Sequence, residues 1–177
     1  MRFEAEGYVA NAAQQLVYEI IRDKLVQLVP YLDNVSAIEE FTREPRDNGQ
    51  HVLNRWRADA GQVPAVARKF IKPEMLEWLD HADWDDGEFW VDWRIEPARF
   101  QGMYSCSGRN RVVVDGDNVR IRIQGELTVD PKKIPGVPSF LVKRVLPAIE
   151  SYLISRMKPN MASLGVGVTR FLAAGGS

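Results

Sequence analysis

Side chains that could carry acid–base chemistry are concentrated between residues 77 and 86. They are Glu77, Asp80, His81, Asp83, Asp85 and Asp86. Histidine titrates near neutral pH, and a carboxyl group enclosed by apolar neighbours has a raised pKa, so both kinds of group could transfer protons. Asp80, Glu77 and His81 are therefore the candidate catalytic residues. The alternative is that the aspartates only shape a hairpin turn, where Asp is favoured for backbone reasons.

The strand that carries these groups has two faces, and the pattern does not decide which face is inward. Over residues 74–84, one face holds Leu76, Trp78, Asp80, Ala82 and Trp84, and the other holds Met75, Glu77, Leu79 and His81. Either register places an acidic group among apolar neighbours. An inward-facing Arg55 on the preceding strand could bind a ligand carboxylate or Glu77. The alternative for Arg55 is a surface pair across two strands.

Metal-dependent and covalent chemistry have few candidate residues. His51 is the only other histidine and Cys106 the only cysteine, so an internal disulfide or a cysteine-rich zinc site cannot form. The chain has no phosphate-binding loop, dinucleotide-binding glycine motif, nucleophile elbow or zinc-protease motif. We therefore predict no metal and no cofactor, and we expect Cys106 to be an inert buried thiol.

A second set of residues is suited to binding. It consists of seven of the aromatic side chains between residues 56 and 104, namely Trp56, Trp78, Trp84, Phe89, Trp90, Trp93 and Tyr104. Large rings on the inner face of a sheet either fill a core or line an apolar pocket. Alternation along the predicted strand 88–96 places Trp93 inward and Trp90 outward.

An antiparallel sheet is the element that must position both sets. Residues 2–10 alternate as a half-buried strand, and Asn11 with Gln14 predicts a capped helix that ends near Pro30. Asn-Gly or Asp-Gly turns at 48–49, 86–87 and 115–116 then separate pairs of strands. The predicted strands cover 37–46, 50–60, 74–84, 88–96, 99–114 and 118–130.

The last predicted element is a helix over residues 147–171. Its apolar stripe consists of Ile149, Leu153, Met157, Met161, Leu164, Val168 and Phe171. Such a helix is about 35 to 40 Å long at about 1.5 Å per residue, so it needs the sheet to cover its stripe. Small residues (Ala162, Ser163, Gly165, Gly167) favour close approach to that sheet, and Pro159 predicts a bend.

Length, composition and charge exclude several classes of function. The chain has 177 residues, 45% of them hydrophobic and 27% charged, with a formal net charge of −1, which suits one domain over residues 1–177. This charge provides no overall attraction to nucleic acid or to an anionic membrane. The charged N-terminus has no apolar signal core, and no apolar run approaches about 20 residues. We expect a cytoplasmic protein without nucleic-acid partners or integral membrane association.

Runs of strands with helices at the two ends predict the α+β class. The order of elements resembles the helix-grip fold of the START and birch-pollen-allergen superfamily, often called SRPBCC, and is most similar to its bacterial-type members. The resemblance covers residues 2–172. It includes the opening strand that runs into Asn11, the segment Ile123-Gln124-Gly125-Glu126-Leu127, and Ile134-Pro135-Gly136 before the terminal helix. It implies a strongly curved antiparallel sheet of about seven strands wrapped around the C-terminal helix.

The resemblance also implies a ligand site between that sheet and the helix. The residues expected to line it are Trp56, Trp78, Trp93, Tyr104, Ile121, Ile123, Leu153, Met157, Met161 and Leu164. In the superfamily, the loop that corresponds to residues 61–72 borders the cavity mouth. Val66, Phe70 and Ile71 are therefore the expected gate, with a plain surface loop as the alternative.

Three functions are compatible with these features. The first, which we favour, is binding or transport of an apolar small molecule or lipid. The second, implied by the resemblance because the superfamily also contains such enzymes, is a polyketide cyclase or dehydratase-like enzyme, which requires Asp80, Glu77 or His81 to face the cavity near a second polar group. The third is a protein-interaction module or homodimer that uses an exposed patch around Trp90 on the outer face of the sheet.

Overall fold

One antiparallel sheet forms the frame of the protein. The structure is a computed structural model that describes residues 1–59, 73–133 and 142–176. Within these residues, seven strands pair in the order β1-β7-β6-β5-β4-β3-β2. The strands are β1 (Arg2–Val9), β2 (Val35–Arg46), β3 (Gly49–Ala58), β4 (Glu77–Asp85), β5 (Trp90–Pro97), β6 (Tyr104–Asp115) and β7 (Asn118–Val129).

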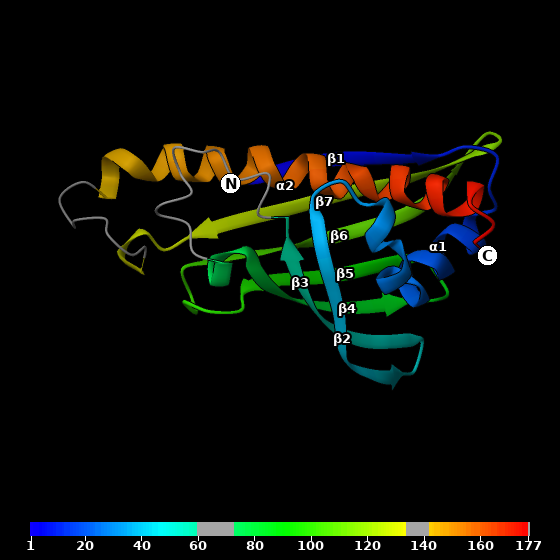
Figure 1. Ribbon diagram of the computed structural model, residues 1–177, viewed down its shortest axis with the longest axis horizontal. Helices are drawn as coiled ribbons and strands as arrows, with labels where there is room; N and C mark the ends of the chain where they lie inside the picture. The colour runs from blue at the N-terminus through cyan, green and yellow to red at the C-terminus, as the bar shows by residue number, and fades with distance from the viewer. Residues whose placement is uncertain (60–72, 134–141, 177) are drawn as a thin grey trace.

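Helices stand at both ends of the sequence, as the α+β prediction requires. After β1 come α1 (Gln14–Asp23) and the 3-10 helix η1 (Leu25–Tyr31), and after β7 come η4 (Pro131–Lys133) and the long α2 (Val142–Ala173). Figure 1 shows α2 lying along β1, and its contacts are mainly with β1, then with β7 and η1. None of the helices in the described parts of the chain combines the length and the apolar character that crossing a membrane requires.

The predicted hairpins β2–β3, β4–β5 and β6–β7 are confirmed, and β4 and β6 begin three or more residues later than predicted for local reasons. Strand β4 begins at Glu77, because residues Pro73–Leu76 form the 3-10 turn η3. Strand β6 begins at Tyr104 rather than near residue 99, because Phe100 (φ 61°) and Gly102 (φ 77°) have left-handed backbone conformations. A left-handed residue cannot continue a strand.

The predicted helix cap at Asn11 is wrong. Asn11 has a φ of 51°, and the residue before α1 is Ala13, which makes no side-chain capping bond. A capping residue needs extended backbone, whereas Asn11 turns the chain in a left-handed conformation that Asn tolerates. Gln14 does not complete a capping box either. Its Nε2 donates a hydrogen bond of 2.7 Å to the carbonyl oxygen of Val112, which attaches α1 to β6.

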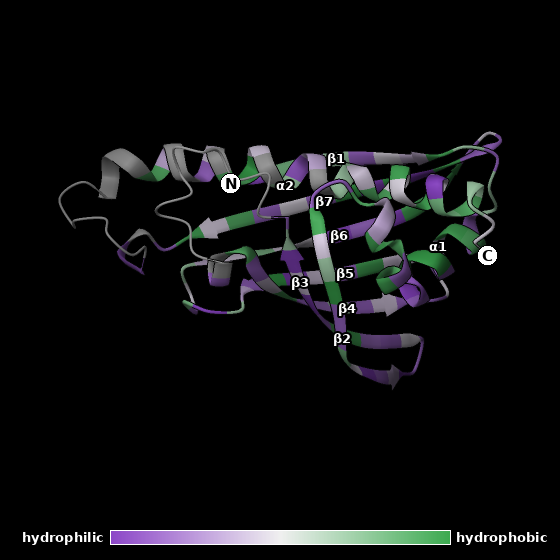
Figure 2. Cartoon of the chain, viewed as in Figure 1, coloured by the Kyte–Doolittle hydropathy of each residue, from purple (hydrophilic) through white to green (hydrophobic). Residues whose placement is uncertain are grey.

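The strand register defines an inner face, covered by the helices, and an outer face. Paired residues lie on the same face, and one row of inner-face pairs crosses five strands through Asn54, Asp80, Ile95, Cys106 and Leu127. Banding along the strands in Figure 2 shows the same alternation of apolar and polar residues. Trp93 faces inward and Trp90 outward, as predicted.

Two glycines allow α2 to lie directly on β1. A Cβ atom on Gly165 would be 2.6 Å from the backbone nitrogen of Tyr8, and one on Gly7 would be 3.1 Å from the carbonyl oxygen of Ala162. A Cβ does not fit at Gly165 and would be crowded at Gly7, so the predicted close approach through small residues is confirmed. Helix α2 continues through both Pro147 and Pro159.

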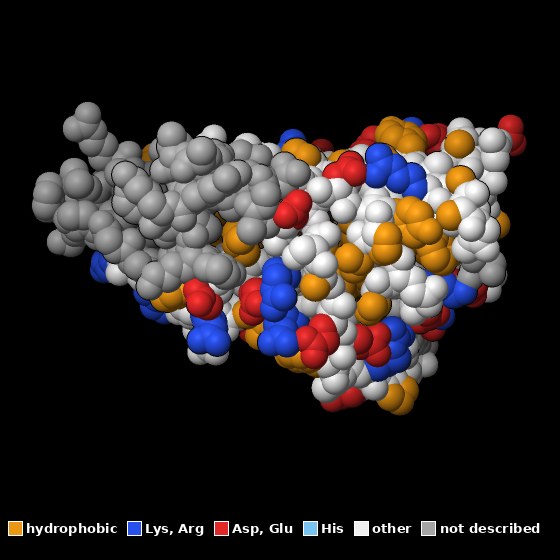
Figure 3. Space-filling view, viewed as in Figure 1, with side chains coloured by type: hydrophobic (Ala, Val, Ile, Leu, Met, Phe, Trp, Pro, Cys, Tyr) orange, Lys and Arg blue, Asp and Glu red, His pale blue; other side chains and the backbone are white. Residues whose placement is uncertain are grey.

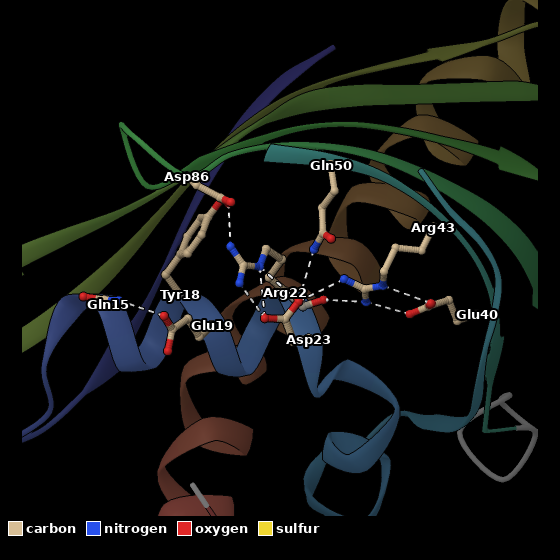
Figure 4. Close-up of polar contacts among 9 residues, drawn as sticks. All are labelled: Gln15, Tyr18, Glu19, Arg22, Asp23, Glu40, Arg43, Gln50 and Asp86. Carbon is tan, nitrogen blue, oxygen red and sulfur yellow. Dashed lines mark hydrogen bonds and ion pairs between the residues drawn. The ribbon is translucent and has the colours of Figure 1, made fainter. Parts of the chain in front are cut away.

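A charged network attaches α1 to the β2–β3 hairpin and to the turn after β4 (Figure 4). The guanidinium of Arg22 contacts Asp23 and Asp86 at 2.6 Å each, and Arg43 contacts Asp23 at 2.9 Å. Gln50 is the third residue that donates a hydrogen bond to Asp23. Burial raises the pKa of Asp23, but hydrogen bonds from Arg22 and Gln50 and the charge of both arginines outweigh it, so the net pKa is lowered.

Candidate functional site

The predicted binding residues divide into a buried group and a half-buried group. Ile121 and Ile123 are 1% exposed and Trp93 is 6% exposed. The other predicted residues are only partly buried, namely Trp56, Trp78, Tyr104, Leu153, Met157, Met161 and Leu164. The first group belongs to the closed core. The second is the part of the inner face that still has apolar surface available for contact with another molecule.

Trp93 is held in the core by two glycines. A Cβ on Gly108 would be 2.6 Å from Trp93 Cζ2, and one on Gly125 would be 2.8 Å from its Cη2. The indole Nε1 also donates a hydrogen bond of 2.7 Å to Asn110 Oδ1. Because its ring fills the space above two residues without side chains, Trp93 acts as a packing residue and offers little surface to a ligand.

The half-buried group is centred on a pair of tryptophans. Trp56 on β3 and Trp78 on β4 are register partners, and their rings stack with centroids 5.8 Å apart and an interplanar angle of 19°. Tyr104 lies at the start of β6, where burial raises the pKa of its phenol. From α2, Leu153, Met157 and neighbouring apolar residues pack against the edge of the core. Methionine side chains adapt readily to differently shaped partners.

Asp80 is the acidic residue that faces inward. It lies opposite Asn54 and Ile95 in the inner-face row, and Asn54 is 3% exposed. Burial raises the pKa of the Asp80 carboxyl from 3.8 to about 7, although the Trp56 indole and the charge of His51 partly oppose this rise. The enclosed Asp80 carboxyl therefore keeps its proton to a higher pH than an ordinary surface aspartate does.

The indole nitrogen of Trp56 is buried and makes no hydrogen bond to any acceptor within the described residues. The indole N–H lies close enough to the Asp80 carboxyl to lower its pKa as a weak hydrogen bond would, but the two groups do not meet the geometry of a full hydrogen bond. Sequence reasoning missed this group and the buried Asn54. The available signal was a polar residue, Asn54, between the apolar Val52 and Trp56 on one face of a strand.

Glu77 and His81 lie on the outer face, away from α2. Glu77 Oε1 contacts Arg57 Nη2 at 2.6 Å, and His81 Nε2 lies 3.2 Å from Glu96 Oε1. The condition that a catalytic group faces the inside is therefore met by Asp80 and not by these two residues. Arg55 is also a surface residue and pairs with Glu39. Acidic and basic side chains are interspersed over the β2–β3 hairpin in Figure 3, as expected for surface pairs.

Around Trp90, the described residues of the outer face form no exposed aromatic patch. The Arg109 guanidinium lies 3.9 Å from the centroid of the Trp90 ring and pairs with Asp92 at 2.6 Å, so a charged group covers the ring. A shallow hollow of about 300 Å³ nearby is lined by His51, His81, Asp83, Asp92, Trp93 and Arg94. Within the described part of the chain, no three His, Cys, Asp or Glu side chains are grouped in a way that could hold a metal ion.

Two other predictions concern single residues or segments. Cys106 is fully buried, as expected, and burial raises the pKa of its thiol to about 12, which favours the unreactive thiol form. The predicted gate residues Val66, Phe70 and Ile71 lie outside the described residues, as does the segment Ile134-Pro135-Gly136.

Comparison with known proteins identifies the fold. No protein-family model and no curated protein sequence matches the chain. Among solved structures, TTHA0849 from Thermus thermophilus is 21% identical over 100% of both chains, with a TM-score of 0.69. The Zhui aromatase/cyclase from Streptomyces sp. R1128 is 17% identical over 100% of both chains, with a TM-score of 0.59.

A third similar structure is Ara h 8.0201, which is 13% identical over 96% of this chain and 98% of that chain, with a TM-score of 0.52. At these identities the likeness concerns the fold. The seven-stranded antiparallel sheet and the long C-terminal helix have the helix-grip arrangement. The predicted fold class and the predicted resemblance in fold are therefore confirmed.

Proposed function

We propose that the protein binds an apolar small molecule on the inner face of the sheet, beside the first half of α2. The ligand contacts the half-buried group, in particular Trp56, Trp78 and Tyr104 from the sheet and Leu153 and Met157 from the helix. Transport of the same molecule is compatible with this site. The proposal does not include Ile121, Ile123 or Trp93, which are already enclosed by the protein.

The observation that carries the proposal is that side chains are fully buried at one end of the inner face and only partly buried at the other. Near α1 and the end of α2, Val9, Ile20 and Val168 are completely enclosed. Trp56, Tyr104 and Leu153 are only partly buried, although they also pack against the core. Removing about 300 Å² of ligand surface from water at about 25 cal/mol per Å² gives about 7 kcal/mol before the costs of association. That free energy is sufficient for micromolar binding without a catalytic group.

The test uses the full chain and N-phenyl-1-naphthylamine, an uncharged fluorescent probe of apolar sites. We expect saturable binding with a dissociation constant in the micromolar range and its displacement by 1-decanol. Met157→Lys should weaken probe binding at least about tenfold, because a charge would enter the apolar wall. Val114→Lys is the matched control, since Val114 is 63% exposed on β6, and it should leave binding unchanged. Absence of probe binding up to about 100 μM would contradict the proposal.

A second candidate function is a cyclase or dehydratase-like reaction with Asp80 as the acid or base. The observation that favours it is the inward carboxyl group, titrating near neutral pH beside the polar Asn54 and the Trp56 N–H. Similar solved structures include aromatase/cyclases. The test is to incubate the protein with a linear polyketide analogue and to follow loss of water by mass spectrometry. Turnover that Asp80→Asn abolishes while probe binding persists would establish an enzyme.

In the part of the chain that the structure describes, the outer face does not provide the apolar patch that an interaction module would need around Trp90, because Arg109 covers that ring. Self-association through another surface is a separate hypothesis. Size-exclusion chromatography with light scattering tests it directly, since a homodimer of this chain would have twice the mass of 20.1 kDa.

A further inference from the structure

One polar group at the proposed site has no partner within the described residues. The Trp56 Nε1 atom is buried, and no acceptor in that part of the chain bonds to it. Buried N–H groups are almost always hydrogen-bonded, because an unmade bond costs free energy that the folded state does not recover. Such an exception marks a position where a ligand atom can complete the bond, provided that a neighbouring side chain moves aside to admit it.

The strand register places an acidic group next to this N–H. Trp56 pairs with Trp78, and the neighbouring inner-face pair is Asn54 with Asp80. Trp56 and Asp80 are therefore diagonal neighbours on adjacent strands, a separation that large side chains bridge. The indole also influences the carboxyl directly. The inner face thus combines one hydrogen-bond donor with one group that accepts when ionised and donates when protonated.

We infer that the ligand carries an uncharged hydroxyl group, an alcohol or a phenol, which binds between Trp56 and Asp80 while its apolar part contacts the half-buried group. This inference rests on the proposed function and adds the chemical class of the ligand. The hydroxyl oxygen accepts a hydrogen bond from Trp56 Nε1. The hydroxyl hydrogen is donated to the Asp80 carboxyl group.

A hydroxyl group fits this pair better than the other common oxygen groups. A ligand carboxylate would bring a second negative charge next to Asp80, and like charges in an enclosed site are unfavourable. A ketone oxygen can accept from Trp56 but has no hydrogen to donate, so its second bond requires a protonated Asp80. Because a hydroxyl group both donates and accepts, it can bond to both residues in either protonation state.

The experiment compares three ligands with the same chain length on the intact protein. The affinities of 1-decanol, 2-decanone and decanoate are measured by displacement of N-phenyl-1-naphthylamine at pH 6 and at pH 8.5. At pH 8.5 we expect decanol to bind at least about tenfold more tightly than decanoate. The decanol hydroxyl gains a charge-assisted hydrogen bond to Asp80, whereas the carboxylate of decanoate is repelled by it. Decanol affinity should be nearly the same at both values of pH. The affinity of 2-decanone should fall several-fold between them, as Asp80 loses its proton.

Variants of the two polar residues identify the groups responsible. Trp56→Phe keeps an aromatic ring but removes the N–H, and it should weaken decanol binding about tenfold while probe binding changes less than about twofold. Asp80→Asn should reduce the preference for decanol over decanoate to less than about threefold. Trp78→Phe is the matched aromatic control. It should weaken all three ligands equally and leave their ratios unchanged.

The outcomes separate this inference from the proposed function. If the probe and all three ligands fail to bind, both are overturned. If the probe binds and decanol and decanoate displace it equally at pH 8.5, the apolar site stands and the hydroxyl inference fails. A preference for decanol that survives unchanged in both Trp56→Phe and Asp80→Asn would also overturn the inference, because other residues would then be responsible for it.

Discussion

The ring of Trp93 occupies the space that Gly125 leaves empty on the neighbouring part of the sheet. A Cβ on Gly125 would lie 2.8 Å from Trp93 Cη2, although the two residues are on strands β5 and β7, which are separated by β6. The glycine therefore allows the tryptophan to lie across an entire strand. This contact, together with the hydrogen bond to Asn110, explains why Trp93 belongs to the core rather than to the binding surface.

Trp93→Phe should consequently destabilise the protein strongly. It removes buried ring atoms above Gly125 and leaves the Asn110 acceptor without its partner, so we expect a loss of about 2 to 4 kcal/mol in the free energy of unfolding. Urea denaturation, monitored by circular dichroism, measures this loss. Trp90→Phe is the control with the same substitution on the same strand. Its ring face can still contact Arg109, so the loss should stay below about 1 kcal/mol. Equal losses would contradict the assignment of Trp93 to the core.

Asp80→Asn should stabilise the protein at alkaline pH. The folded-state pKa of about 7 lies above the ordinary value of 3.8, so the folded protein binds the proton more tightly than the unfolded chain. The contribution of this group to wild-type stability is therefore greatest below pH 4, declines between about pH 4 and 7, and is constant above that range. Asparagine does not ionise, so the variant avoids this decline.

Urea denaturation of both proteins at pH 5 and pH 8.5 tests this prediction. The free energy of unfolding of Asp80→Asn, relative to that of the wild type, should increase by about 2 to 3 kcal/mol between these values of pH. Asp33→Asn is a suitable control, because the Asp33 side chain is 60% exposed and its substitution should show a far smaller dependence on pH. An advantage that does not change with pH would show that the Asp80 carboxyl is not enclosed as described.

Much of the fold could be predicted from local patterns. Alternation along 88–96 was sufficient to place Trp93 inward and Trp90 outward, and the Asn-Gly and Asp-Gly pairs located three hairpins. The apolar stripe with its small residues indicated that the last helix packs closely on a sheet. These features depend on neighbours in sequence, so a single chain contains the necessary information.

The residues of the candidate site could not be predicted fully, because their positions depend on contacts between distant segments that local sequence patterns do not show. Both faces of residues 74–84 carry large apolar side chains, so alternation could not distinguish the inward Asp80 from the outward Glu77. Trp93 was an expected ligand contact, because the aromatic pattern does not reveal that Gly108 and Gly125 lie beneath its ring. The predicted helix cap at Asn11 is wrong for a similar reason. Its side chain suits a helix cap, but its backbone is needed for the turn after β1.

Asp23→Ala should weaken the attachment of α1 to the sheet. The carboxylate accepts hydrogen bonds from Arg22, Arg43 and Gln50, and its loss leaves two arginines with fewer partners. We expect a loss of about 1 to 2 kcal/mol in the free energy of unfolding near neutral pH. Because the pKa of Asp23 is lowered, this contribution is present above its ordinary value of 3.8 and disappears as the pH falls through the folded-state value.

Salt and a matched variant test the same network. The destabilisation by Asp23→Ala should decrease in about 1 M sodium chloride, where charges are screened beyond about 3 Å. Asp33→Ala removes an exposed carboxylate that pairs with Arg170 at 2.7 Å, and it should cost less than about 1 kcal/mol. If the two variants lose the same stability, the network shown in Figure 4 contributes no more than an ordinary surface pair.

Gly165→Ala should separate α2 from β1. The new Cβ would lie 2.6 Å from the Tyr8 backbone nitrogen and 2.9 Å from the Gly7 carbonyl carbon, and backbone atoms of a paired strand cannot move aside without shifting the whole helix. Alanine favours a helix over glycine by about 1 kcal/mol, but overpacking costs about 1 to 3 kcal/mol or more. We expect a net loss of about 1 to 2 kcal/mol in urea denaturation.

Gly167→Ala, two residues further along the same helix, distinguishes backbone contact from helix propensity. Its Cβ would meet the end of the Leu32 side chain at 2.7 Å, and a leucine side chain can change rotamer, unlike the backbone of β1. The propensity gain is the same for both variants, so Gly167→Ala should be at least about 1 kcal/mol more stable than Gly165→Ala. If both substitutions have the same effect, α2 does not rest on the backbone of β1, and the wall it forms beside the half-buried group would have to be placed differently.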